Sequence, residues 1–139
     1  MAATMNENIE TMLAAETFAV VGASTNPRKY GYIAYKALKA AGKTAYPVNP
    51  RAKDIEGDPC YPSVAELPEK PEVVVSIVPP ALTEKLVEQL AEQGIKNLWI
   101  QPGAESEAAV ADAGERGIAT VHGGPCLMVN LRTRAAGRG

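Results

Sequence analysis

Short apolar runs alternate along this chain with segments in which apolar residues recur every three or four positions. Each apolar run is expected to form a strand, and the runs lie at 18–21, 44–48, 72–78, 97–100 and 118–121. Helical spacing separates them at 32–41, 82–91 and 105–116, and an N-terminal helix has Asn6 as its expected N-cap. The run at 72–78 is almost wholly apolar, which is typical of a strand buried on both faces of a parallel sheet.

Turn-forming residues fill the segments between these elements. Residues 51–62 are expected to form a loop, because Gly57 and two prolines interrupt them, and residues 63–67 a short helical turn. The predicted fold is α/β, a single Rossmann-like domain with a five-stranded parallel sheet and helices on both faces. Right-handed crossovers restrict the strand order to a few possibilities. Of these we favour 3-2-1-4-5, numbered along the chain, with 2-1-3-4-5 as the alternative. The domain is expected to span residues 1–131, and residues 132–139 to form a flexible basic tail.

Length, charge and composition argue against several classes of function. The 139 residues suffice for one domain, and a net charge of -2 argues against a nucleic-acid partner. No apolar run is long enough for a membrane-spanning helix. Cys60 and Cys126 show no metal or redox spacing and fit a reducing compartment. The protein is therefore expected in the cytoplasm, without a nucleic-acid or membrane partner, and its exposed helices would allow a homodimer.

The first predicted strand runs into a loop that begins at Gly22 and leads into a helix at Gly31. In an open α/β sheet such a loop presents backbone N–H groups to a phosphate. Its two glycines are nine positions apart, unlike the dinucleotide fingerprint, which packs three glycines into about six residues. The loop adds hydroxyls and cations, and its candidate phosphate-binding residues are Gly22, Ala23, Ser24, Arg28, Lys29 and Gly31. The alternative is a plain strand-to-helix turn.

The residues after the second predicted strand indicate which kind of nucleotide the site would bind. NAD-binding sheets place an acidic residue there to hold the ribose hydroxyls. This chain has Asn49 and Arg51 instead, followed by Lys53. That replacement indicates a further phosphate on or near the ribose, as in coenzyme A or NADP. For each cation alone, a solvated loop charge is an equal alternative.

Two further strand ends form candidate rims of the site. Proline lacks a backbone N–H, so the rim after the third strand would be an apolar wall, unless its prolines only terminate the strand. In the rim after the fourth strand, glycine permits close approach of a ligand and glutamine can hydrogen-bond an amide. The rim residues are Val78, Pro79 and Pro80, and then Gln101, Pro102, Gly103 and Ala104.

His122 and Cys126 are the residues best suited to covalent chemistry. A Cys–His pair is a candidate nucleophile or disulfide-forming thiol. A buried cysteine is the favoured interpretation, because no Asp or Asn stands nearby in sequence to orient the imidazole. A single histidine argues against a metal site. Glu105 and Glu107 suit the first turn of a helix, so neither a catalytic nor a metal site is predicted.

Several segments, in this order, resemble the small CoA-binding domain proteins, which are similar to the CoA-binding domain of the succinyl-CoA synthetase α subunit. The similarity covers about residues 10–131. Its motifs are Gly22-Ala23-Ser24, Tyr46-Pro47-Val48-Asn49-Pro50, Ile55-x-Gly57, Tyr61, Glu66-Leu67-Pro68, Val78-Pro79-Pro80 and the segment Trp99 to Ser106.

The resemblance implies that coenzyme A lies at the strand ends. It would place Gly22, Ser24, Arg28 or Lys29 and Gly31 at the phosphates, Asn49 and Arg51 near the adenosine, 78–80 beside the adenine or pantetheine, and 101–104 along the arm. Ligase activity is not implied, since no segment matches the synthetase's phosphohistidine domain and His122 does not match its histidine. Replacing Gly31 by Val is expected to abolish binding while leaving much of the fold.

The expected function is therefore binding of coenzyme A or an acyl-CoA by a non-catalytic carrier or sensor. Two alternatives remain open at the level of the sequence. One is a redox or regulatory module that binds NADP or NAD, and the other is an interaction protein with a vestigial pocket.

Overall fold

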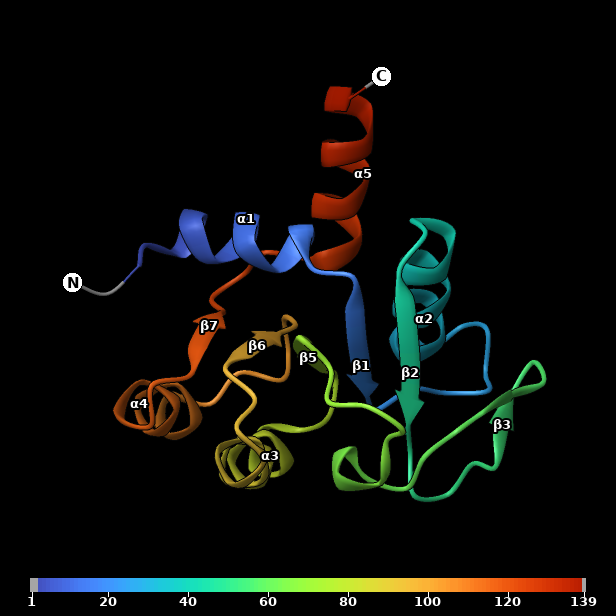
Figure 1. The fold of residues 1–139 in the computed structure, drawn as a ribbon, viewed down its shortest axis with the longest axis horizontal. Coiled ribbons are helices and arrows are strands. Elements are labelled where there is room, and N and C mark those ends of the chain that lie inside the picture. Colours follow the sequence, from blue (N-terminus) through green and yellow to red (C-terminus); the bar gives the residue numbers. More distant parts are fainter. Residues whose placement is uncertain (1–2, 139) are drawn as a thin grey trace.

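A five-stranded parallel sheet forms the centre of the protein (Figure 1). The computed structural model describes residues 3–138, with side chains described up to residue 133. From one edge to the other, the strands are β2 (Thr44–Val48), β1 (Thr17–Val21), β5 (Val73–Ser76), β6 (Asn97–Ile100) and β7 (Ala119–Val121). All neighbours pair in parallel, so their carboxyl ends lie along one edge of the sheet.

The strand order confirms the alternative, 2-1-3-4-5, and the favoured order 3-2-1-4-5 is wrong. β5 pairs with β1 from Phe18↔Val73 to Val21↔Ser76, in the middle of the sheet. The physical reason lies in burial: all four residues of β5 are buried, which a strand with one open edge would not achieve. β2 occupies the edge instead. Pro47 has no backbone N–H to donate to a neighbouring strand, and an edge strand tolerates this loss.

Helices cover both faces of the sheet, as predicted. One face carries α1 (Met5–Ala14), α2 (Tyr30–Ala40) and α5 (Leu127–Arg138), and the other carries η1 (Val64–Glu66), α3 (Pro80–Gln93) and α4 (Glu107–Glu115). Side chains of one strand alternate between the two cores, since Phe18 and Val20 pack on the first and Ala19 on the second. Two apolar layers therefore hold the strand ends rigidly in line.

Several element boundaries differ from the prediction in ways the caps explain. α1 begins after Thr4, whose hydroxyl accepts from the Glu7 N–H while the Glu7 carboxylate accepts from the Thr4 N–H. Asn6 is therefore inside the helix and not its cap. α4 begins after Ser106, which leaves Glu105 outside the helix, and Gly94 ends α3 in the left-handed conformation as predicted.

The loop predicted at 51–62 contains a small hairpin of β3 (Asp54–Ile55) and β4 (Asp58–Pro59). Its turn residues Glu56 and Gly57 both have positive φ, 51° and 88°, as a two-residue hairpin turn requires. Tyr32 and Tyr35 of α2 donate hydrogen bonds to the carboxylates of Glu56 and Asp58. These contacts fix the hairpin, and with it the end of β2, against α2.

The C-terminal segment is helical up to Arg138, so most of the tail expected at 132–139 is part of a helix, and its flexibility stays a prediction. α5 extends to Arg138, and Gly139 lies outside the described residues. Leu127 is fully buried, and Trp99 Nε1 donates to the carbonyl of Pro125 just before the helix, at 3.2 Å. These contacts anchor the first turn of α5, from which the chain continues as helix. The proposed domain boundary at residue 131 stays a prediction.

Candidate functional site

The candidate site lies along the carboxyl ends of the strands, where the chain reverses direction across the sheet. After β1 the chain moves outward to β2 and then returns to the other side of β1 to form β5, so β1 and β5 flank the switch point. Open α/β sheets bind ligands at this position. Two cavities occupy it, one of about 510 Å³ and one of about 360 Å³, and Val78 lines both.

The first cavity lies between the ends of β1 and β2 and the exposed side of α3. It is lined by Asn49 and Arg51, which were expected near the adenosine, by Gly22, which was expected at the phosphates, and by Val78. Its lining also includes residues that the sequence did not indicate, namely Ser63, Val64, Leu82, Lys85 and Gln89. Arg51 and Lys85 give this cavity two cations, and no acidic side chain is among the described residues that line it.

The α3 residues were missed because helical spacing assigned Leu82 to the buried face. Leu82 is 47% exposed, whereas Leu86, Val87 and Leu90 form the buried stripe. Leu82, Lys85 and Gln89 stand three and four positions apart, which places them on one exposed face of the helix. The sequence did contain a signal for this face: polar residues follow Leu82 at helical spacing, in a helix that starts at the strand ends.

Gly22 and Gly31 are glycines because β1 and α2 approach closely. A Cβ at Gly31 would lie 2.0 Å from the carbonyl oxygen of Gly22. Gly22 has a φ of 100°, and a Cβ there would lie 3.1 Å from the backbone of Ile77. Gly31 is buried in this contact, so its position in the structure is explained by packing.

The first backbone amides of the loop are used inside the protein. The N–H groups of Gly22 and Ala23 both donate to the carbonyl of Val48, at 3.0 and 3.3 Å. The sequence predicted that the Gly22 N–H would bind a diphosphate, but this N–H already donates to a carbonyl within the protein. α2 begins after Lys29 without a side-chain cap. The N-terminal turn of α2 is therefore the part of this region that can bind an anion.

The middle of the loop forms a turn at Asn26-Pro27. Ser24 Oγ accepts from the Asn26 N–H, and Asn26 Oδ1 accepts from the Arg28 N–H, each at 3.0 Å. The Lys29 N–H closes the turn on the carbonyl of Asn26 at 3.0 Å. The side chains of Arg28 and Lys29 are exposed, outside the lining of both cavities, while that of Ser24 stabilises the turn.

Asn49 joins the loops that follow β1 and β2. Its Nδ2 donates to the carbonyl of Ala23 at 2.8 Å, and its Oδ1 accepts from the Arg51 N–H at 2.8 Å. Its own N–H donates to the carbonyl of Tyr61 at 2.9 Å. Asn49 therefore lines the cavity while holding its wall in shape, and Arg51 is presented beside it.

The second cavity unites the two predicted rims. It lies between the ends of β5 and β6 and is lined by Ile77, Val78, Pro79, Pro80, Pro102, Gly103 and Ala104. All of these residues are apolar or glycine. Such a groove suits a ligand chain with few charges, and Gly103, with a φ of 96° and no atom within 4 Å of a Cβ, leaves its wall open.

Gln101 is placed elsewhere than expected for a ligand contact. Its side chain is 2% exposed and lines neither cavity. Its Oε1 accepts from the Leu127 N–H at 2.8 Å, and its Nε2 lies 3.8 Å from Cys126 Sγ. Gln101 does bind an amide, as its chemistry suggested, but that amide belongs to the start of α5.

His122 and Cys126 do not form a pair within the described residues. His122 Nδ1 contacts Thr120 Oγ1 at 3.1 Å, whereas Cys126 Sγ contacts Tyr30 Oη at 3.7 Å. Burial opposes ionisation of the Cys126 thiol, but the Val129 N–H, the Tyr30 hydroxyl and the Gln101 amide outweigh it and lower its pKa.

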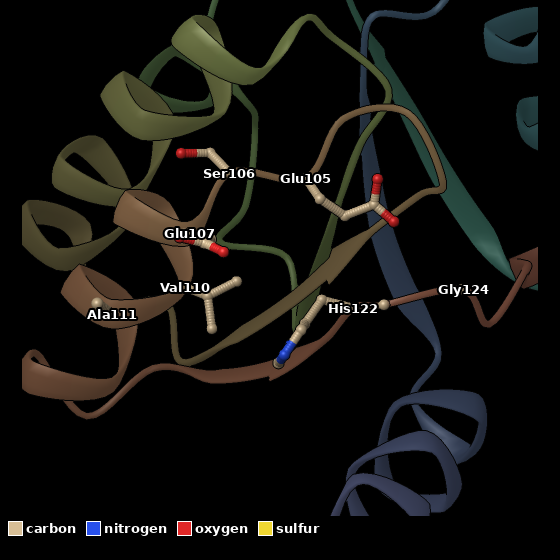
Figure 2. Close-up of a pocket in the computed structure, with 8 residues that line it drawn as sticks. Glu105, Ser106, Glu107, Val110, Ala111, His122 and Gly124 are labelled. Carbon is tan, nitrogen blue, oxygen red and sulfur yellow. The ribbon is translucent and has the colours of Figure 1, made fainter.

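A third cavity of about 600 Å³ continues the same edge of the sheet beyond the second. It lies between the start of α4 and the end of β7 (Figure 2). No group of His, Cys, Asp and Glu that could hold a metal occurs among residues 3–138. Within that same range, no helix is both long and apolar enough to cross a membrane.

Comparisons with known proteins match this geometry. The family described as CoA binding domain matches residues 16–132. Acetate–CoA ligase (ADP-forming) I of Archaeoglobus fulgidus is 33% identical over 133 residues, covering 88% of this chain and 19% of the ligase. The structure of a hypothetical protein from Pyrococcus horikoshii OT3 has a TM-score of 0.86 at 35% identity and covers 95% of this chain and 92% of that one.

A longer enzyme chain shows the same fold over part of its length. Dinucleotide-forming acetyl-coenzyme A synthetase 1 of Ca. Korarchaeum cryptofilum, in its apo form, has a TM-score of 0.71 at 27% identity. The match covers 88% of this chain and 30% of the synthetase, so this chain corresponds to under a third of that enzyme. The family match begins just before β1 and ends within α5, so it includes the whole sheet and every strand end of the site. The chain belongs to the CoA binding domain family.

Proposed function

We propose that the chain binds coenzyme A in an extended pose along the carboxyl edge of the sheet. The adenosine occupies the cavity between β2 and α3, the diphosphate lies at the start of α2, and the pantetheine arm follows the cavity between β5 and β6. The observation that supports this pose is the sharing of Val78 by the two cavities, which makes one groove across the switch point.

Charge in the first cavity favours coenzyme A over NAD. Arg51 and Lys85 both line it, and the 3′-phosphate of coenzyme A supplies the charge that two cations would bind. A site for NAD would instead present a carboxylate to the ribose. NADP also carries a ribose phosphate, but the apolar groove between Pro80 and Pro102 suits a pantetheine arm better than a charged nicotinamide ring.

The role we propose is that of a carrier or sensor located in the cytoplasm. The described residues that line these two cavities include no His, Cys, Asp or Glu, the side chains that most often act as nucleophile, acid or base. What the two cavities supply is therefore binding and orientation. We expect coenzyme A to be recovered unchanged by mass spectrometry after incubation with the protein.

Calorimetric titration with coenzyme A, dephospho-coenzyme A and NADP tests the assignment. We expect coenzyme A to bind with a micromolar or tighter dissociation constant. Dephospho-coenzyme A should bind about tenfold more weakly, because it lacks the charge that Arg51 and Lys85 face. Arg51→Ala and Lys85→Ala should each reduce this preference for coenzyme A.

Lys96→Ala is the matched control, because Lys96 is exposed and precedes β6 at the opposite edge of the sheet. It should leave the affinity for coenzyme A unchanged. Tighter binding of NADP than of coenzyme A would overturn the proposal. Absence of heat and of any shift in melting temperature with all three ligands would support a vestigial pocket instead.

A further inference from the structure

We propose that the cavity between α4 and β7 receives the acyl group of an acyl-CoA, and that this group is short, aliphatic and uncharged. This inference rests on the proposed function, because it extends the same pose of coenzyme A by one strand. It turns a CoA-binding groove into a site that selects among thioesters.

The cavity lies at the distance that the pantetheine arm spans. From β1, where the diphosphate is placed, three steps between neighbouring strands lead through β5 and β6 to β7. At the usual strand spacing these steps amount to about 14 Å. The arm has a backbone about as long as four peptide residues, so its extended length is also about 14 Å. The thiol end of the ligand is therefore expected at β7.

The second and third cavities are lined by consecutive residues of the loop after β6. Gly103 and Ala104 line the cavity between β5 and β6, and Glu105, the next residue, lines the cavity beside β7. Glu105 Oε1 accepts from the Gly103 N–H at 2.7 Å, which holds its side chain back against this loop. A ligand chain that passes Gly103 therefore enters the third cavity next.

The lining of the third cavity suits a small aliphatic group. Figure 2 shows Val110 of α4 and His122 after β7 on either side of the same space, with Ala111 one position further along the helix. Gly123 and Gly124 complete the wall, and a Cβ at either would meet no atom within 4 Å. The volume of about 600 Å³ exceeds what an acyl group of a few carbons needs.

The charged residues of this cavity select against acyl groups that end in a carboxylate. Glu105 and Glu107 both line it, and neither Lys nor Arg is among its described lining residues. A succinyl group would bring a third negative charge into this space without a cation to balance it. His122, whose ring is held through Nδ1 by Thr120, is a polar group available to a thioester carbonyl, whereas the hydroxyl of Ser106, which also lines the cavity, donates to Glu84.

Titration of the unmodified protein with a series of thioesters tests this inference. Butyryl-CoA should bind about fivefold more tightly than acetyl-CoA, because each fully buried methylene is worth about fourfold in affinity and this cavity buries them in part. Succinyl-CoA should bind at least fivefold more weakly than butyryl-CoA. Equal affinity for butyryl-CoA and succinyl-CoA would overturn the selection against charge.

Ala111→Phe fills the cavity from an exposed position of α4 and should remove the preference for butyryl-CoA. Ala108→Phe is the matched control, because Ala108 is exposed on the same helix but does not line the cavity. The control should keep the wild-type preference. Loss of the preference in both variants would overturn the inference.

The outcomes for the two proposals are distinguishable. If coenzyme A binds but butyryl-CoA shows no advantage over acetyl-CoA, the acyl cavity is wrong and the proposed function stands. If coenzyme A itself does not bind, both proposals fall together.

Discussion

Two residues that the sequence marked as ligand contacts use their side chains to hold the protein itself together. Asn49 and Gln101 were both singled out by position, and the structure places both at strand ends. Their side chains, however, contact backbone groups of Ala23, Arg51 and Leu127 and, for Gln101, also Cys126 Sγ. A residue type and its place after a strand can be predicted from the sequence, but its hydrogen-bond partners depend on loops and helices that are distant along the chain.

Gly31 illustrates how a packing requirement can be mistaken for ligand binding. We expect Gly31→Ala to lower the free energy of unfolding by about 3 kcal/mol, since overpacking at a contact between backbones costs roughly that much. The added Cβ would lie 2.0 Å from Gly22 O, so β1 and α2 would have to separate. Thermal melting should show a decrease of about 10 °C. This expectation replaces the view that a larger residue here leaves the fold largely unaffected.

Gly114→Ala provides the control for that measurement. Gly114 lies within α4, and a Cβ there would meet no atom within 4 Å. Replacing a helical glycine by alanine should leave the melting temperature unchanged or raise it slightly. A Gly31→Ala protein that melts at or above the wild-type temperature would show that the close approach of α2 to β1 is not what requires glycine.

At the scale of elements, periodicity identified all five strands of the sheet and the helices between them. It failed where an element is short or where tertiary contacts decide. The hairpin at 54–59 has strands of two residues, which depend on the tyrosines of α2. α5 depends on hydrogen bonds that Pro125 and Leu127 make with Trp99 of β6 and with Gln101 just after it, and the sequence after residue 131 shows no apolar repeat. The strand order follows from the burial of β5 in the middle of the sheet. The order of elements along the chain does not contain this information.

The start of β1 is tied to the start of β5 by one carboxylate. Glu72 accepts from the N–H groups of Glu16 and Thr17 at 3.0 and 3.3 Å and from Thr17 Oγ1 at 3.2 Å. The Glu16 N–H contributes most to lowering the pKa of Glu72, while partial burial opposes it. Because the pKa is lower in the folded state, this stabilisation is present above the unfolded pKa of about 4.3 and is lost as the pH falls through the folded value.

We therefore expect Glu72→Gln to be less stable than wild type at pH 7, by at most about 1 kcal/mol because solvent screens the carboxylate. The difference should shrink towards zero below pH 4. Urea unfolding at pH 7 and pH 3 measures both values, with the exposed Glu66→Gln as the control variant. A difference that grows on acidification would contradict the stated role of Glu72.

At the scale of the whole molecule, the sheet places three cavities in a row along one edge. The sequence predicted this edge because parallel strands bring their carboxyl ends together, and most of the predicted residues line the first two cavities. The contribution of α3 and the third cavity required the three-dimensional structure. A homodimer stays a prediction.

Longer relatives use the same unit as one part of a larger enzyme. The chain spans 19% of the Archaeoglobus ligase and 30% of the Korarchaeum synthetase chain, but 92% of the Pyrococcus horikoshii protein. A domain that holds coenzyme A along one sheet edge, as we propose, uses α3 and α4 to line the site and leaves α1 and α5 outside it. That arrangement is consistent with the same fold occurring both in a chain of this size and within longer ones.

A crystal structure of the protein with coenzyme A tests the central claim most directly. We predict the adenosine between Asn49 and Lys85, with its 3′-phosphate near Arg51, and the pantetheine arm passing Val78 and Gly103 so that its sulfur reaches the cavity beside β7. Coenzyme A bound at the amino ends of the strands, or on either helical face with this groove empty, would contradict the account.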